Sequence, residues 1–376
     1  MRDFKLETYF AQWEFIAKFH LTASDCESMS QNELVKLASL EDQANFEELR
    51  LGYTETRGQF ELRDVIASTY ADLNREDILC FSGSEEGIYI AMKILLKAND
   101  HAIVFTPSYQ SAETVPLSIC EVSGLMLRPE VNWEPEIEEL KTLIRPNTKL
   151  IYINFPNNPT GKAISLSKLL GLISLCRENG IWLFSDEVFR GVESDPAKLV
   201  PQVADLYERG FSLNGLSKAY GLPGLRIGWI AGKDHSKLEQ MHRYRHYLSM
   251  CNSGPSEQLS LIALKARATI LKRNVSLIRS NLALLREFFS EFTDTFEWYE
   301  PDGGCVAFPR YLGPGNVECW ATTLVNDTGV LLLPSNIYES ELTATPTDRF
   351  RIGFGRANFA AGLNILREAL MKAREH

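Results

Sequence analysis

From Ile78 onward, short apolar runs alternate with longer segments of helical periodicity, and this alternation restricts the chain to an α/β fold. The runs are apolar at successive positions, as strands must be when helices cover both faces of their sheet. Helices are predicted over 85–97 and 166–178, and Gly180 is the predicted C-cap of the second. The predicted strands are 78–81, 102–105, 149–154, 181–185, 211–214 and 226–231.

The length of the chain predicts its domain organisation, because 376 residues exceed what one hydrophobic core usually supports. We expect a large domain over 46–268, a smaller α+β C-terminal domain over 269–376, and an N-terminal segment over 1–45. A helical pattern over about 270–289 is the expected connector. An aromatic stretch near the N-terminus predicts a helix that either covers the mouth of a site or packs on the smaller domain. Its aromatic residues are Tyr9, Phe10, Trp13, Phe15 and Phe19.

Charge and cysteine usage exclude several functional classes. A net charge of −10 argues against nucleic acid as the main partner. The 7 scattered cysteines form no C-x-x-C pair, so we expect reduced thiols and neither a disulfide framework nor a zinc site. No secretory core and no apolar run of bilayer length are found, which predicts a cytoplasmic protein. His242 and His246 stand four residues apart in a basic stretch, which we interpret as a solvated helix face without a metal.

Polar clusters follow several predicted strands, at the ends where binding residues of such sheets gather. Each has an ordinary explanation when taken alone: an N-cap, a turn, a charged strand end or a surface lysine. Their shared position in one α/β unit favours a single binding site. The clusters are Ser82-Gly83-Ser84, Asn157 to Gly161, Asp186, and Ser217-Lys218.

Lys218 is the centre of the predicted chemistry. A lysine amine can condense with an aldehyde cofactor as an imine, and pyridoxal 5'-phosphate (PLP) is the cofactor that requires this bond. Asp186 is the candidate carboxylate that keeps the pyridine nitrogen of PLP protonated. The amide of Asn158 can supply a neutral donor to the ring oxygen.

The phosphate of PLP needs backbone N–H groups at a helix N-terminus, which the chain offers near Gly83, Ser84 and Glu85. It also needs a cation, and Arg226 suits this role because a guanidinium can donate two hydrogen bonds to one phosphate (bidentate binding). An aromatic ring should cover the cofactor ring, and Tyr109 is the candidate.

Specific motifs run through nearly the whole chain in one order. NNPTG at 157–161 and SKAYGLPGLRIG at 217–228 are highly specific together. Shorter stretches accompany them: GYTETRG at 52–58, SGSEEG at 82–87, TPSY at 106–109, SDEVF at 185–189 and RIGFG at 351–355. With these motifs the sequence resembles the class I/II aminotransferases, which are PLP-dependent enzymes of fold type I.

The resemblance implies a mostly parallel seven-stranded sheet covered by helices, and a homodimer with shared active sites. Lys218 would form the internal imine and move a proton between substrate and cofactor carbons. Ser217 would help to hold the phosphate, and Tyr53 would reach the phosphate of the neighbouring subunit. Arg351 would grip the α-carboxylate of the substrate, beside Asn158.

The reaction that the resemblance implies is transfer of an amino group between an amino acid and a 2-oxo acid by a ping-pong mechanism. PLP enzymes of this fold also include lyases and cyclases that act on specialised amino acids, and these are the alternative. A PLP-fold binding protein without turnover is a third hypothesis. Gly215 stands where relatives often have a serine that binds phosphate, and losing one neutral hydrogen bond of about 1 kcal/mol predicts weaker cofactor retention without loss of binding.

Phe189 stands where the family usually has a tyrosine that donates to the ring oxygen of the cofactor. Without that hydroxyl, the ring phenolate loses one stabilising partner, so we expect the internal imine to titrate at a higher pH than is usual for the family. An absorbance titration of the PLP-loaded protein measures this pKa. An ordinary value would contradict the expectation.

Overall fold

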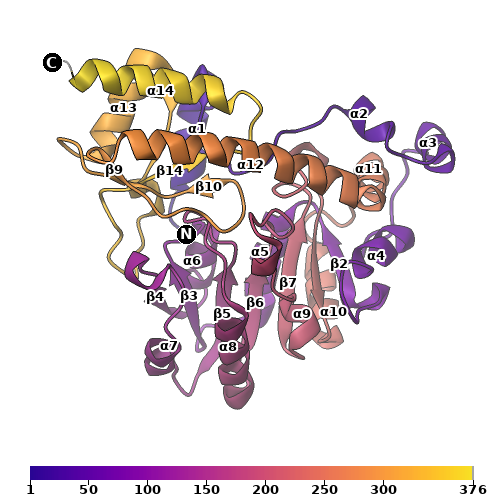
Figure 1. Ribbon diagram of the computed structural model, residues 1–376. Coiled ribbons are helices and arrows are strands. Elements are labelled where there is room, and N and C mark those ends of the chain that lie inside the picture. The colour runs from indigo at the N-terminus through magenta and orange to yellow at the C-terminus, as the bar shows by residue number, and fades with distance from the viewer. Residues whose placement is uncertain (375–376) are drawn as a thin grey trace.

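A seven-stranded sheet organises the structure, a computed structural model that describes residues 1–374 (Figure 1). In spatial order its strands are β2 (Ile78–Phe81), β8 (Gly228–Gly232), β7 (Gly210–Gly215), β6 (Trp182–Asp186), β5 (Thr148–Asn154), β3 (His101–Thr106) and β4 (Glu121–Met126). β8 runs antiparallel to its neighbours β2 and β7, and the other adjacent pairs are parallel. The predicted α/β fold with a mostly parallel seven-stranded sheet is thus confirmed.

Side chains alternate between the two faces of this sheet, and each face carries its own core. Ile103 and Phe105 of β3 belong to one core, and Ala102 and Val104 belong to the other. Burying one large side chain of this kind contributes about 1.5–3 kcal/mol, so helices are held on both faces. Helices α7 (Ile137–Leu143) and α8 (Leu166–Asn179) cover the first face, and α5 (Ser84–Leu95), α6 (Ser111–Leu117) and α10 (His235–Arg245) cover the second.

Two strands differ from the sequence-based expectation. The pattern did not predict β4, because this edge strand is only partly buried and contains Glu121, Ser123 and Gly124. The strand expected from Arg226 begins at Gly228 instead. Arg226 has a φ of 52°, in the left-handed region, which no regular strand contains. The predicted C-cap is confirmed, since Gly180 ends α8 with a φ of 63°.

The C-terminal part of the chain lies above the large sheet in Figure 1. Its longest element is α12 (Arg267–Glu291), which contains the helical pattern predicted over 270–289. α14 (Phe359–Arg374) packs against α12 and also against α13 (Val317–Thr328). A small antiparallel sheet has the order β10 (Val306–Ala307), β14 (Phe350–Gly353) and β13 (Leu333–Pro334).

The remaining elements are short. The helices are α1 (Lys5–Trp13), α2 (Gln31–Val35), α3 (Leu40–Glu47), α4 (Phe60–Ala67), α9 (Val203–Leu206) and α11 (Gly254–Lys265). The strands are β1 (Phe19–His20), β9 (Phe296–Glu297), β11 (Arg310–Tyr311) and β12 (Val330–Leu331). Single turns of 3-10 helix are Arg75–Asp77, Pro129–Val131, Pro196–Lys198, Pro223–Leu225 and Ser335–Tyr338.

The N-terminal chain is tied to the C-terminal part. β1 pairs in parallel with β12, and the residues that follow it, 21–27, run along β14; we call them the strap. The backbone N–H of Gly353 donates to the carbonyl of Leu21 at 2.9 Å. A Cβ on Gly353 would overlap the carbonyl oxygen of Ala23, so only glycine lets the strap lie this close to β14.

Within residues 1–374, no helix has both the length and the apolar character needed to cross a membrane. The cysteines are all free in the structure, and most of them are buried. Cys319 is exposed and Cys251 is partly exposed.

Candidate active site

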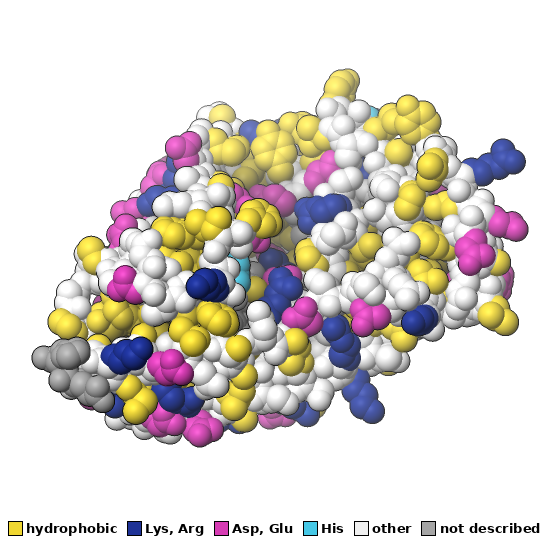
Figure 2. All heavy atoms as spheres, turned by 90° about the horizontal axis from the view of Figure 1, so that it is seen from above, with side chains coloured by type: hydrophobic (Ala, Val, Ile, Leu, Met, Phe, Trp, Pro, Cys, Tyr) yellow, Lys and Arg dark blue, Asp and Glu magenta, His cyan; other side chains and the backbone are white. Residues whose placement is uncertain are grey.

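A cavity of about 490 Å³ opens where β5, β6 and β7 end. The molecule is visibly hollowed in Figure 2, where basic and acidic side chains gather around the recess. The predicted site residues that line the cavity are Ser84, Glu85, Tyr109, Asn158, Asp186, Ser217, Lys218 and Arg226. The lining is completed by Phe4, Glu7, Ile88, Asn154, Val188, Phe189 and Pro223.

Asp186, the last residue of β6, is buried with its carboxylate at this cavity. The carboxylate accepts hydrogen bonds from the Val188 N–H at 3.2 Å and the Tyr152 hydroxyl at 3.3 Å. Burial raises the pKa of Asp186 to about 6 against the effect of these neutral donors. A positively charged N–H partner would therefore stabilise the carboxylate strongly at this position.

Asn154 links the ends of the polar clusters. Its side-chain NH2 donates to the backbone carbonyl of Asp186 at 3.0 Å, and its side-chain oxygen accepts from the backbone N–H of Asn158 at 2.8 Å. One buried side chain thus fixes the backbone that carries both predicted cofactor ligands. Asn154 lies just before the NNPTG motif at 157–161, and the sequence alone did not assign it a role.

The amide orientation of Asn158 is set by two donors. The Tyr338 hydroxyl donates to Asn158 Oδ1 at 2.8 Å, and Arg351 Nη1 donates to the same oxygen at 3.0 Å. Arg351 Nη1 also donates to the Tyr338 oxygen at 2.6 Å, which closes a triangle. Because the amide oxygen is engaged on this side, the NH2 group of Asn158 is the end available to the cavity.

Arg351 lies behind Asn158 and is fully buried, at 0% exposure, so it does not line the cavity. Its Nη2 donates to the carbonyl of Thr22 in the strap at 2.6 Å. Its Nε has no hydrogen-bond partner among the residues that the structure describes. A buried guanidinium with an unsatisfied donor can take an additional anionic ligand.

Lys218 lies between the first cavity and a second one of about 870 Å³, and it lines both. Its Nζ donates to Ser24 Oγ in the strap at 3.0 Å. Burial lowers the pKa of the amine, and the charge of nearby Asp25 acts in the opposite direction. A lowered pKa increases the fraction of neutral amine, the form that reacts with carbonyl carbons and accepts protons.

The second cavity is rich in carboxylates. Glu7, Glu14, Asp25 and Glu27 line it together with Arg356, which pairs with Asp25 at 2.8 Å. Partial burial raises the pKa of Glu14, and repulsion from the other carboxylates adds to this effect. The two cavities share Glu7, so one continuous space extends from Asp186 to these acids.

A tight anion cradle forms at the start of α5. Gly83 has a φ of 98°, and a Cβ there would overlap the Arg226 guanidinium, which therefore lies directly against the helix N-terminus. A Cβ on Gly228 would lie 2.6 Å from the Ser84 backbone nitrogen. A side chain at position 215 would overlap Ser84 Oγ, so the glycine found there makes room for the Ser84 hydroxyl.

The aromatic residues take different positions. Tyr109 lines the cavity with its ring 5.3 Å from that of Phe4, just before α1, and Phe189 lines the cavity without a hydroxyl. Helix α1 reaches the cavity through Glu7, and its Tyr9 donates to the Leu332 carbonyl. The helix is shorter than the aromatic stretch, since it ends at Trp13 and Phe19 belongs to β1. Tyr53 lies apart and is 88% exposed.

Of the histidine pair His242 and His246, at the C-terminal end of α10, only His242 differs from the expected solvated face. The His242 side chain is only 13% exposed, and its Nε2 lies 2.8 Å from the Thr56 hydroxyl. Its ring packs edge-on against that of His246, which remains exposed. Within residues 1–374, no group of three or more His, Cys, Asp or Glu side chains is arranged to hold a metal ion.

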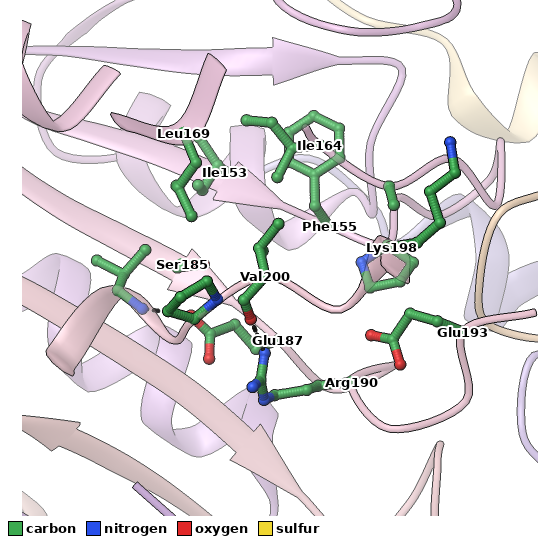
Figure 3. Close-up of a pocket in the computed structure, with 14 residues that line it drawn as sticks. Ile153, Phe155, Ile164, Leu169, Ser185, Glu187, Arg190, Glu193, Lys198 and Val200 are labelled. Atoms are coloured by element: carbon green, nitrogen blue, oxygen red, sulfur yellow. Dashed lines mark hydrogen bonds between the residues drawn. The ribbon is translucent and has the colours of Figure 1, made fainter. Parts of the chain in front are cut away.

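A much smaller cavity, of about 20 Å³, lies next to Glu187 and has room for one water molecule (Figure 3). Glu187 is buried; its Oε1 accepts from the Val203 N–H at 3.0 Å and the Ser212 hydroxyl at 2.9 Å. Its Oε2 has no partner among the described residues. Figure 3 shows Arg190 beside Glu187, but the guanidinium donates to the Val200 carbonyl.

Three features that position the site could not be found in the sequence motifs. Tyr338 and Ser24 come from segments with no recognisable motif, and both contact predicted site residues far away in the chain. Tyr152 lies inside a strand whose apolar pattern gave no sign of its bond to Asp186.

Comparison with known proteins gives a consistent picture. The family profile described as Aminotransferase class I and II matches residues 16–364. Capreomycidine synthase of Streptomyces vinaceus is 27% identical over 369 residues, which are 97% of this chain and 93% of that protein. A PLP-dependent aminotransferase from Streptococcus suis has a crystal structure with a TM-score of 0.92 at 28% identity, covering 99% of this chain and 98% of its own. The crystal structure of the PLP-dependent cyclase OrfR shares the fold, with a TM-score of 0.91 at 24% identity and coverage of 99% and 98%.

The buried Glu187 predicts a pH dependence of stability. Burial raises its pKa from 4.5 to about 7, so between these values the unfolded chain releases a proton that the folded chain keeps. Stability therefore falls as the pH rises through this window, by up to about 3 kcal/mol. Glu187→Gln should remove this loss of stability. The free energy of unfolding of the variant, measured with urea, should therefore rise relative to that of the wild type between pH 5 and pH 8. Glu178→Gln, on the exposed surface of α8, is the control; an equal trend in both variants would contradict the assignment.

Proposed function

Since the chain belongs to the aminotransferase class I and II family and is a PLP-dependent enzyme of that family, we propose that it transfers an amino group between an amino acid and a 2-oxo acid. The observation that carries the proposal is the Lys218 amine in a cavity that also holds the Asp186 carboxylate, the Asn158 amide and the α5 N-terminus. These groups match the parts of PLP one by one.

The donor set fits PLP. In the described part of the chain, the buried Asp186 carboxylate has only neutral hydrogen-bond donors, and it would pair with the ring nitrogen. The NH2 of Asn158 would donate to the ring oxygen. Gly83, Ser84 and Glu85 at the start of α5 would hold the phosphate with Ser217 and Arg226, and Tyr109 would cover the ring. When bound, PLP supplies an electron-accepting ring that weakens the bonds to the α-carbon of the amino acid.

Lys218 would hold the cofactor and then move the substrate's proton. Its amine lines both cavities, so it can reach a molecule in either. Because burial lowers the pKa of the amine, the neutral form is accessible and can accept the proton from the α-carbon and later return it.

Arg351 and Asn158 would bind the α-carboxylate. Within residues 1–374, the Arg351 Nε has no hydrogen-bond partner, and its Nη2 donates to the neutral carbonyl of Thr22. A carboxylate is a stronger acceptor than this carbonyl, so the substrate would compete with the strap for Arg351.

A homodimer with shared sites belongs to the same proposal, with Tyr53 reaching the phosphate in the partner subunit. Tyr53 is 88% exposed and the neighbouring Leu51 is 84% exposed, so both side chains are available to a second copy. The proposal also includes a division into domains over 46–268 and 269–376, with an N-terminal segment over 1–45. It further includes a cytoplasmic location, with which the free cysteines agree.

A PLP-dependent cyclase or lyase is the second candidate. Two observations favour it: the similarity to a capreomycidine synthase over nearly the whole chain, and Phe189 in place of a hydroxyl donor. A binding protein without turnover is disfavoured by the complete set of Lys218, Asp186 and Asn158 around one cavity.

Lys218→Ala should abolish turnover and covalent attachment of PLP. Among the described residues, Lys218 is the only lysine that lines either cavity, so no other amine can replace it. Borohydride treatment of the PLP-loaded wild type, followed by peptide mass spectrometry, should locate the label on Lys218. Lys233→Ala, which removes an exposed lysine, should keep full labelling and activity; a wild-type label on any other lysine would refute the proposal.

A substrate screen separates the two candidate reactions. With 2-oxoglutarate or pyruvate as acceptor, an aminotransferase should produce the 2-oxo acid of the donor, whereas a lyase or cyclase should turn over without any acceptor. We expect donors with cationic side chains to react best, because Glu7 and Glu14 line the adjoining cavity. Turnover that is independent of the acceptor, measured by product mass and ammonia release, would decide for the second candidate.

A further inference from the structure

The strap brings one hydroxyl group to the Lys218 amine. Ser24 Oγ lies 3.0 Å from Lys218 Nζ, and within residues 1–374 it is the only oxygen to which that amine donates a hydrogen bond. Ser24 is only 8% exposed and lines the second cavity, so its hydroxyl is held in a defined place beside the amine. It belongs to none of the motifs that the sequence analysis used.

Both ends of the strap are anchored around this contact. Before Ser24, the carbonyl of Leu21 accepts from the Gly353 N–H at 2.9 Å. After Ser24, the Cys26 N–H donates to the backbone carbonyl of Lys218 at 3.2 Å, and the Glu27 N–H donates to the carbonyl of Gly355 at 2.8 Å. A Cβ on Gly355 would lie only 2.5 Å from the Asp25 carbonyl oxygen, so the strap has no room to shift toward the smaller sheet. Ser24 is thus held by backbone contacts on both sides, as a positioning group must be.

The charged and titratable groups that face the Lys218 amine are Asp25, Arg351, Cys305 and Asp186. Asp25 is paired with Arg356 at 2.8 Å, and Arg351 is bound by Tyr338 and Asn158. Asp186 has its own donors in Val188 and Tyr152. These groups act on the amine through space, and Ser24 is the group that touches it.

We propose that Ser24 is a positioning residue for Lys218, which holds the amine at the junction of the two cavities whenever it is not bonded to the cofactor. This inference rests on the proposed function and extends it to a residue of the N-terminal segment. In that role the hydroxyl accepts a hydrogen bond from the amine and keeps its own proton, while the amine exchanges a proton with the substrate α-carbon.

The first test follows the covalent uptake of PLP by the full-length protein after the cofactor has been removed. The rate depends on the neutral fraction of the Lys218 amine, so its pH profile reports the pKa of that amine. Ser24→Ala removes an acceptor that stabilises the ammonium form, and the profile should move to lower pH by about 0.7 unit. Ser24→Thr keeps the hydroxyl and should restore the wild-type profile, and Ser290→Ala on the exposed face of α12 should not move it.

The second test compares α-protonated and α-deuterated donor in the loaded enzyme. Ser24→Ala should lower kcat about tenfold with little change in KM, and the deuterium isotope effect on kcat should rise, because a less well-placed amine slows proton transfer. Ser24→Cys keeps the side-chain volume but places a weak hydrogen-bond acceptor there, so it should change kcat and the isotope effect in the same directions. This variant replaces Ser24→Ala in the test if the alanine variant folds poorly.

Unchanged pH profiles and isotope effects in Ser24→Ala and Ser24→Cys would overturn the role of Ser24. The proposed function would survive that result, provided that PLP labels Lys218 and an amino donor is consumed. Absence of the label on Lys218 would remove the proposed function instead, so the two failures are distinguishable.

Discussion

The register of three parallel strands determines where the chemistry of this protein can occur. In the ladder between β5 and β6, Asn154 stands opposite Asp186, and in the next ladder Asp186 stands opposite Leu213 of β7. The loops that leave these strand ends carry Asn158 and Lys218, so the register of the strands brings both residues to one cavity. A shift of one residue in any of these ladders would turn the polar side chains to the opposite face.

The sequence predicted the half of the site that depends on this register. Asp186 ends an apolar strand, and Asn158 and Lys218 come a few residues after two others; that local pattern is visible without a structure. Tyr338 and Ser24 were not predictable in the same way, because Tyr338 is 180 residues from Asn158 and Ser24 is 194 residues from Lys218. The edge strand β4 was not predicted either. It pairs with a strand on one side only, so it is less buried and its sequence is partly polar.

The charge distribution divides the site into two regions. At the α5 N-terminus, Arg226 and backbone N–H groups favour an anion, and the carboxylates of the second cavity favour a cation. Lys218 lies where the two regions meet. The first region is common to any reaction that PLP supports, so differences in specificity within such a fold are expected to come from the second region and from the strap beside it.

The position of the first residues of the chain has a practical consequence for handling the protein. Phe4 and Glu7 line the first cavity, and Arg2 binds Glu113 at 2.8 Å beside it. Extra residues fused in front of Met1, such as an affinity tag with its linker, would emerge next to the opening and obstruct the entry of ligands. Purification handles are therefore better placed elsewhere, and kinetic constants from N-terminally tagged material should be compared with those of the cleaved protein.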